Sequence, residues 1–273
     1  MPLDRLRKEA AYQRLLARLV EVAPPDMWAL KGGLAMIARV GRDARATRDA
    51  DTTWRGEGDL LAAALEAVVD LDLEDHFVFE IEIEPRPITA ESPDGGLRYS
   101  VVARLDGREF ERLQLDVNLV PDDPRPVEIV QLRGLLDFAG MPAPAVPMVD
   151  VGQHLAEKLH AYARDHGEAA NSRARDLFDM LVLAEHVPVA ELTRLRHARK
   201  VTFELRSTPW PPVLPAPPAA WEPAWRGFVA DHNLRWGHLD DAHAALAAFW
   251  QDVLHDASGH REWDPVSWRW EGR

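Results

Sequence analysis

The chain of 273 residues is 47% hydrophobic and 28% charged, which is ordinary for a protein of one or two globular domains with ample core. It has no cysteine, so disulfides, thiolate metal sites and cysteine nucleophiles are excluded. The start is charged rather than apolar, and no apolar run is long enough to span a bilayer, so we expect a cytoplasmic protein that contacts no membrane. The net charge is −13, so we expect the protein to bind nucleic acid only through local basic clusters.

Hydrophobic periodicity in the first half of the chain alternates between helix and strand. The patterns predict helices at residues 6–19, 34–42 and 60–71, and strands at residues 27–30, 49–54, 77–84, 98–105 and 109–120. The last two strands flank Asp106-Gly107, a dipeptide that favours a hairpin turn. This half is therefore predicted to form a mixed α/β (α+β) core.

The second half is predicted to be mainly helical. Six prolines between residues 121 and 147 indicate a boundary region, and helical patterns follow at residues 151–164, 173–186 and 240–254. A proline-rich stretch at residues 209–223 favours an extended chain. Eight of the ten tryptophans lie beyond residue 200, and we interpret them as packing of this part rather than as base-stacking platforms. We expect a core with an N-terminal helix at 1–140 and a mainly helical lobe at 141–273.

The most informative segment for function is residues 31–51. Lys31-Gly32-Gly33 follows the apolar strand, and glycines let a backbone approach a phosphate group closely. Asp49 and Asp51 come further on, and carboxylates two residues apart on an extended segment point the same way. Such a pair suits a hard divalent cation together with substrate phosphates. The two patterns in this order predict a nucleotide site.

A third carboxylate comes from the strand at 109–120. Its apolar residues share one face, and Asp116 lies on the other with Gln114 and Asn118. Aspartate is disfavoured within strands. Asp116 is therefore either a solvent-exposed aspartate of an edge strand or a third metal ligand beside Asp49 and Asp51, and we favour the ligand.

Two basic clusters stand out against the negative total charge. Arginines recur every three residues at positions 39, 42, 45 and 48, between the glycines and the aspartates, so we favour phosphate or nucleic-acid contact for them. The second cluster, at residues 194–200, fits a solvated face as well as a binding surface.

With these motifs the chain resembles the AbiEii/AbiGii-type nucleotidyltransferases, MenT-like toxins of type IV-style toxin–antitoxin and phage-defence pairs. The resemblance covers about residues 26–186 and depends on four motifs that occur in the family's order. They are Leu30-Lys31-Gly32-Gly33-Leu34-Ala35, Arg45-Ala46-Thr47-Arg48-Asp49-Ala50-Asp51, Glu157-Lys158-Leu159 and Arg173-Ala174-Arg175-Asp176-Leu177-Phe178-Asp179. The departures at Leu34, Thr47 and Ala50 remove no charged group.

The resemblance implies a nucleotidyltransferase fold and a set of roles. Asp49, Asp51 and Asp116 would hold Mg²⁺ or Mn²⁺, with Asp116 ligating metal or accepting the proton of the attacking hydroxyl. Lys158 would contact the triphosphate rather than simply extend to solvent, and Asp176 would orient Lys158 or the nucleotide. The residues expected at the NTP are Lys31, Gly32, Gly33, Arg45, Thr47 and Arg175. Asp179, four residues after Arg175, is expected to pair with it and to be structural.

The resemblance also implies a reaction and its partners. We expect transfer of NMP from an NTP to RNA, at the tRNA 3′ end, which blocks translation and growth, with a cognate antitoxin as partner and the site between core and lobe. Phosphorylation of Thr47 would place negative charge at the triphosphate and is a candidate off-switch. One alternative is nucleotidylation of a protein or a small molecule, and another is a catalytically silent binding module.

Overall fold

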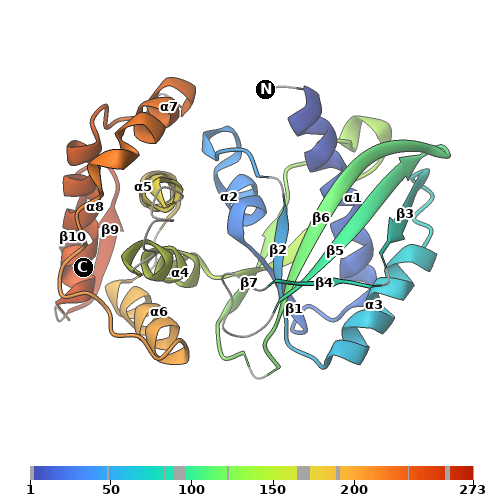
Figure 1. Ribbon diagram of the computed structural model, residues 1–273, viewed down its shortest axis with the longest axis horizontal. Helices are drawn as coiled ribbons and strands as arrows, with labels where there is room; N and C mark the ends of the chain where they lie inside the picture. Colours follow the sequence, from blue (N-terminus) through green and yellow to red (C-terminus); the bar gives the residue numbers. More distant parts are fainter. Residues whose placement is uncertain are drawn as a thin grey trace. The chain divides into compact units, whose positions relative to one another are not determined.

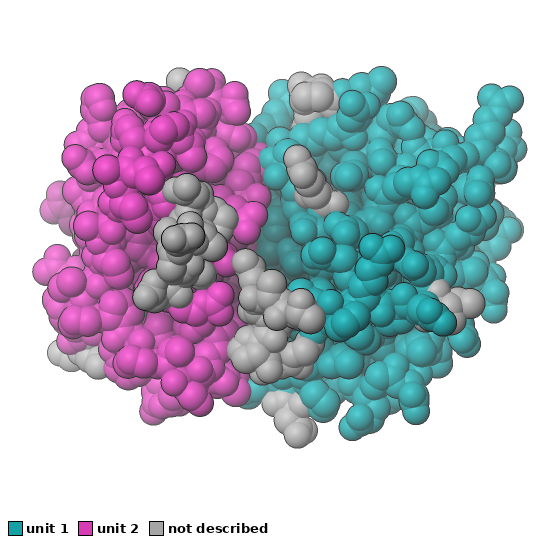
Figure 2. Space-filling model, in the orientation of Figure 1, with its two compact units in different colours: residues 1–42, 46–149 teal, residues 43–45, 150–273 magenta. Residues whose placement is uncertain are grey.

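The computed structural model describes residues 3–47, 49–82, 84–88, 96–121, 123–164, 173–188, 191–232, 234–255 and 259–272. The chain forms two compact units (Figure 2), unit 1 with residues 1–42 and 46–149 and unit 2 with residues 43–45 and 150–273. Within the described ranges, none of the helices combines the length and apolar composition needed to cross a membrane. The expected contact of Arg48 and the end of the strand predicted at 77–84 concern positions 48 and 83, which lie outside the described residues.

Unit 1 is a mixed sheet with three helices (Figure 1). The helices are α1 (Leu3–Val22), α2 (Gly32–Val40) and α3 (Gly58–Asp70), and a short 3-10 turn (Gly41–Asp43) follows α2. The strands are β1 (Trp28–Lys31), β2 (Ala50–Trp54), β3 (Phe77–Ile81), β4 (Arg86–Ile88), β5 (Gly96–Leu105), β6 (Arg108–Leu119), β7 (Val127–Gln131) and β8 (Ala145–Val149).

The sheet order is β3-β5-β6-β2-β1-β8-β7, with β4 beside β5. Strand β2 pairs parallel with β6, and β1 pairs parallel with β8, whereas the other neighbours are antiparallel. Figure 1 shows the long β5 and β6 strands side by side, and α1 packs against β6. The parallel β2–β6 pair lies in the middle of the sheet, and it positions the acidic residues described below.

One hydrophobic core joins the three helices to the sheet. On β6, Leu113, Leu115 and Val117 are buried in this core, so the alternation predicted for this strand is confirmed. Asp116 therefore points away from the α1 side, because successive side chains of a strand alternate between faces.

A buried ion network joins α1 to the segment before β3. Asp75 accepts from Arg14 Nε at 2.6 Å and from Arg18 Nη2 at 2.7 Å, and all three residues are buried. Burial alone would raise the pKa of Asp75, but the hydrogen bonds from Arg18 and Arg14 outweigh it and hold this pKa below its usual range. The two arginines of α1 thus tie this helix to the segment before β3 through buried ion pairs.

Unit 2 is mainly helical, as the sequence predicted for this part of the chain. Its helices are α4 (Val151–Ala163), α5 (Ala174–His186), α6 (Leu192–Leu205), α7 (Glu222–His232) and α8 (Leu239–Leu254), with a 3-10 turn at Ala219–Trp221. A two-stranded sheet of β9 (Arg261–Asp264) and β10 (Arg269–Gly272) follows. Phe249 of α8 packs edge-on to Trp250 and Trp263, so these tryptophans belong to a packed core as interpreted from the sequence.

The unit boundary lies later than residue 140. Strand β8 reaches Val149 and pairs with β1 and β7, so the sheet continues through the proline-rich region. The sequence patterns did not indicate β4, β7, β8, α6, α7 or the β9–β10 pair, whereas the other helices and strands of both halves were predicted within a few residues.

Candidate active site

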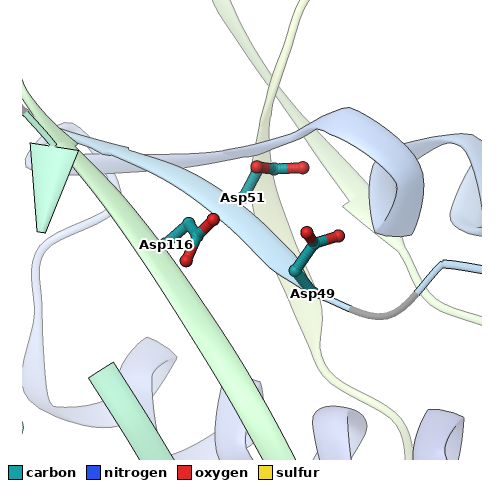
Figure 3. Close-up of side chains that lie close together, drawn as sticks. All are labelled: Asp49, Asp51 and Asp116. Atoms are coloured by element: carbon teal, nitrogen blue, oxygen red, sulfur yellow. The ribbon is translucent and has the colours of Figure 1, made fainter. Parts of the chain in front are cut away.

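The three aspartates singled out in the first half come together on the sheet of unit 1. Asp51 on β2 and Asp116 on β6 are paired in register, and Asp49 directly precedes β2. One carboxylate oxygen from each residue lies within 4.8 Å of the others (Figure 3). Asp116 is buried, and Asp49 and Asp51 are half-buried. With this spacing the three carboxylates could together hold a small divalent cation.

Two basic residues flank these aspartates along the same row of the sheet. Lys31 on β1 is the register partner of Asp51, and Arg98 on β5 is the register partner of Asp116. Arg98 donates from Nε to Asp116 Oδ1 at 2.8 Å and from Nη2 to Oδ2 at 2.6 Å. Partners in register share a face of the sheet. The row across four strands is therefore Arg98, Asp116, Asp51 and Lys31.

The glycine pair packs closely against this acidic group. Gly32 begins α2 with a φ of +64°, and a Cβ on it would lie 1.9 Å from Asp51 Oδ2. A Cβ on Gly33 would lie 2.4 Å from Thr47 Oγ1. Glycine is required at position 32 both for the backbone angle and for the space. The N-terminus of α2, which favours negative charge, thereby lies beside Asp51.

Thr47 connects the acidic group to a neighbouring cavity. Its hydroxyl donates to Asp49 Oδ1 at 3.0 Å, and the residue lines a cavity of about 530 Å³ that Tyr12 of α1 also lines. Burial raises the pKa of Tyr12 well above its ordinary value, and the carboxylates of the three aspartates raise it further. The Tyr12 phenol therefore stays neutral at physiological pH and donates to the Gln114 carbonyl at 3.0 Å.

The second predicted group, Lys158 and Asp176, comes together in unit 2. Lys158 on α4 lies 3.1 Å from Asp176 Oδ1 and 2.8 Å from Asp179 Oδ2, both on α5. Asp179 also accepts from Nε and Nη2 of Arg45, each at 3.0 Å. Arg173 lies 3.3 Å from Asp176. The result is a compact network of three cations and two carboxylates.

Charge pairing keeps Lys158 and Asp179 ionised. Burial alone would lower the pKa of Lys158, but the carboxylates of Asp179 and Asp176 outweigh it and raise the pKa. Burial alone would raise the pKa of Asp179, but Lys158 and Arg45 outweigh it and lower the pKa. Lys158 is thus a fixed positive charge near neutral pH.

The structure also changes the interpretation of several residues. Asp179, expected to pair with half-buried Arg175, pairs instead with Arg45 and Lys158, and its side chain is fully buried. Arg45, expected at the nucleotide, donates two hydrogen bonds to Asp179. Sequence reasoning did not find Arg98, because no motif includes it.

Fold and site together define an enzyme class. A glycine-rich helix N-terminus next to Asp-x-Asp on one strand, with a third carboxylate on the adjacent parallel strand, is suited to phosphoryl chemistry on nucleotides. The chain belongs to the AbiEii family, nucleotidyltransferase toxins of type IV toxin–antitoxin systems, whose sequence model matches residues 14–249. The protein is therefore a nucleotidyltransferase toxin, as its motifs indicated.

A solved structure has a similar fold. MenT4, a nucleotidyltransferase toxin from Mycobacterium tuberculosis H37Rv, is similar at 18% sequence identity with a TM-score of 0.58, covering 97% of this chain and 87% of that one. A protein from H. pylori described as a nucleotidyltransferase shares 17% identity with a TM-score of 0.48, covering 94% of this chain and 96% of that one. No curated protein sequence matches the chain significantly.

Proposed function

We propose that the protein transfers NMP from an NTP to the 3′ end of tRNA in a Mg²⁺-dependent reaction that releases pyrophosphate, blocks translation and halts growth. The observation that carries the proposal is the group of three carboxylates within 4.8 Å beside the α2 N-terminus. The family pairs a toxin with an antitoxin. We therefore propose a cognate antitoxin as partner, with cytoplasmic action and a role in phage defence.

The donor set fits Mg²⁺ or Mn²⁺ because it consists of carboxylate oxygens, which hard divalent cations prefer. Asp49 and Asp51 hold the cation, and Asp116 completes the set. A cation bound there neutralises charge that develops on the α-phosphoryl group during transfer. Because Gly32 has no side chain, the Asp51 carboxylate and the helix N-terminus can lie close together.

The chain's own groups bind and orient the triphosphate. The amide N–H groups of Gly32 and Gly33 at the start of α2 donate hydrogen bonds to phosphate oxygens, and the Thr47 hydroxyl donates to another. Lys31, Arg45 and Arg175 remain proposed nucleotide contacts.

Two groups of unit 2 complete the proposal. Lys158 contributes a fixed positive charge, and its side chain is 13% exposed despite two carboxylate partners. Asp176 holds the Lys158 ammonium in place.

The transfer step is an in-line displacement. The acceptor hydroxyl oxygen forms a bond to the α-phosphorus, the bond to the bridging oxygen breaks, and pyrophosphate leaves with the electron pair. Asp116 accepts the hydroxyl proton while Lys158 offsets charge on the leaving phosphates.

An RNA acceptor is supported by the local charge of α6. Arg194, His197 and Lys200 are exposed on this helix, and Glu204 is its single acidic residue. Arg199 differs, because it is buried and stacks over Trp210. A cationic face on a protein of net charge −13 is suited to a phosphodiester backbone.

The reaction is tested by incubating the protein with tRNA and each labelled NTP in Mg²⁺ or Mn²⁺. We expect label on tRNA with one preferred NTP, and loss of at least about 100-fold in rate with Asp49→Asn or Asp116→Asn, because each removes a charged ligand. Label on a protein or small molecule instead of RNA would overturn the tRNA proposal. A folded protein that labels nothing would favour a silent binding module.

The role of α6 has its own test. The double change Arg194→Glu and Lys200→Glu should weaken tRNA binding and flatten its salt dependence by about one unit of slope per lost phosphate contact. NTP binding should be unchanged. The control is Arg226→Glu, which makes the same kind of charge reversal at an exposed position of α7. Equal loss with both variants would remove α6 from the RNA surface.

A further inference from the structure

Arg98 occupies both oxygens of a carboxylate that the metal site needs. Its two hydrogen bonds to Asp116 are short and parallel, and the β5–β6 register holds the two residues opposite each other. Asp116 is 7% exposed, and the Arg98 side chain is 38% exposed. The guanidinium thus covers the third carboxylate from the solvent side and has room to leave it.

A cation that binds the three carboxylates meets this guanidinium in two ways. It shares oxygens of Asp116 with Arg98, and it is repelled by the positive charge of Arg98 a few ångströms away. At the same time, the fork of two N–H groups that fits a carboxylate also fits a phosphate. The Arg98 guanidinium, which competes with the metal for Asp116, is therefore also suited to bind a phosphate group of the substrate.

The β-sheet confines such a rearrangement to the side chain. The Arg98 backbone pairs with β4 on one side, at Arg86, and with β6 on the other, at Asp116. Because the main chain is fixed on both sides, a new partner must lie within reach of the guanidinium from this position. Asp49 and Asp51 also raise the pKa of Arg98, behind the larger effect of Asp116, so all three carboxylates act on it.

We propose that Arg98 exchanges partners during nucleotide binding. It holds Asp116 while the carboxylates carry no cation, and it moves to a phosphate oxygen of the NTP when a divalent cation occupies them. The inference rests on the proposed function for the identity of the anion. Arg98 thereby makes metal binding depend on the nucleotide: the bare cation competes with Arg98, and the cation with NTP gives Arg98 a second acceptor.

The first test measures Mn²⁺ binding without nucleotide by electron paramagnetic resonance, using the full chain. Arg98→Gln should bind Mn²⁺ about tenfold more tightly, because a competing positive charge is gone. Arg98→Lys keeps the charge and should stay near wild type. The matched control is Arg104→Gln on the same strand, where Arg104 forms a similar pair with Glu80 away from the aspartates.

The second test measures binding of a non-hydrolysable NTP in the presence of Mn²⁺. Arg98→Gln should weaken this binding about tenfold or more, because a charge-assisted hydrogen bond to phosphate is lost. Arg98→Lys should recover part of it. The opposite signs for bare cation and for nucleotide are the signature of the exchange, and a purely structural arginine would not produce them. Thermal unfolding of each variant verifies that it is folded.

Three results would overturn the inference. Weaker Mn²⁺ binding in Arg98→Gln would mean that Arg98 only orients Asp116, and unchanged NTP binding would mean that it has no phosphate partner. The proposed function fails separately, when wild-type protein binds Mn²⁺ and NTP with these responses and still labels no tRNA. If Asp116→Asn leaves Mn²⁺ binding intact, Asp116 is no ligand of the cation and the exchange is refuted.

Discussion

Replacing Gly32 by alanine tests the close approach on which the site depends. The added methyl would lie 1.9 Å from Asp51 Oδ2 and 2.7 Å from its Cγ, so the carboxylate must turn away or the helix start must shift. The change also places an L-residue at a φ of +64°. The two effects are separable, because the strain acts on stability and the displacement acts on the ligand.

The expected magnitudes follow from these two terms. An L-residue in the left-handed region costs about 1–2 kcal/mol, which for a unit of this size lowers the melting temperature by about 2–8 °C. Displacing a ligand by a fraction of an ångström or more costs about 10–100-fold in metal affinity, as is typical when the support of a ligand is lost. Gly140→Ala supplies the control, since Gly140 has a φ of 74° and a Cβ there meets no described atom within 4 Å.

The assay combines thermal unfolding with Mn²⁺ titration of both variants and wild type. We expect similar losses of stability in the two variants, and a loss of Mn²⁺ affinity only in Gly32→Ala. NMP transfer should fall in parallel with Mn²⁺ affinity. If Gly32→Ala bound Mn²⁺ as tightly as Gly140→Ala does, the packing of Gly32 against Asp51 would not control the site.

Three further predictions concern other residues. Asp75→Asn leaves Arg14 and Arg18 buried without their carboxylate and should destabilise the protein by about 3–5 kcal/mol in denaturant unfolding; a change below about 1 kcal/mol would contradict the ion network. Thr47→Glu places a negative charge beside Asp49, 3.0 Å from the present hydroxyl, and should abolish transfer, whereas Thr47→Ser retains it; full activity of Thr47→Glu would end its candidacy as a control point. Because the folded pKa of Asp179 is lowered, its stabilisation is complete above its unfolded pKa of about 4 and is lost as pH falls through the folded pKa. The stability difference between wild type and Asp179→Asn should therefore be constant from about pH 8 to pH 5 and shrink below pH 4, and convergence near pH 6 would contradict the lowered pKa.

Local sequence patterns were sufficient to predict the strands on which Asp51 and Asp116 lie and the face of the sheet that Asp116 occupies. Strict alternation on β6 identified the face of Asp116, and the Asp106-Gly107 turn identified the hairpin. The pairing of Asp116 with Arg98 could not be predicted, because it depends on the register of the β5–β6 pair. A regular hairpin from the pair Leu105–Arg108 would align Arg98 with Leu115, but an irregularity between Ala103 and Arg104 shifts the alignment by one residue. A shift of one residue changes the face, so sequence spacing alone misses the arginine.

Strand β8 and helix α6 were not predicted, because each contains residues that are typical of another structure or role. Pro147 lies within β8, although proline removes a donor and argues against a strand inside a sheet. In α6, several basic residues lie between Leu192, Leu195 and Ala198, which form a buried apolar stripe. The segment was therefore interpreted as a basic cluster and not as a packed helix. In both cases tertiary packing decides the structure, and a local pattern does not contain that information.

The assignment of residues 43–45 to unit 2 bears on how this chain can be divided. Arg45 precedes β2 in the sequence, yet its guanidinium pairs with the fully buried carboxylate of Asp179. A fragment of residues 150–273 would lack this arginine and would leave Asp179 with Lys158 as its remaining cation among those described. Cutting the chain at residue 149 therefore does not yield two modules, and a recombination that exchanged the second half between relatives would have to bring a compatible residue 45 with it.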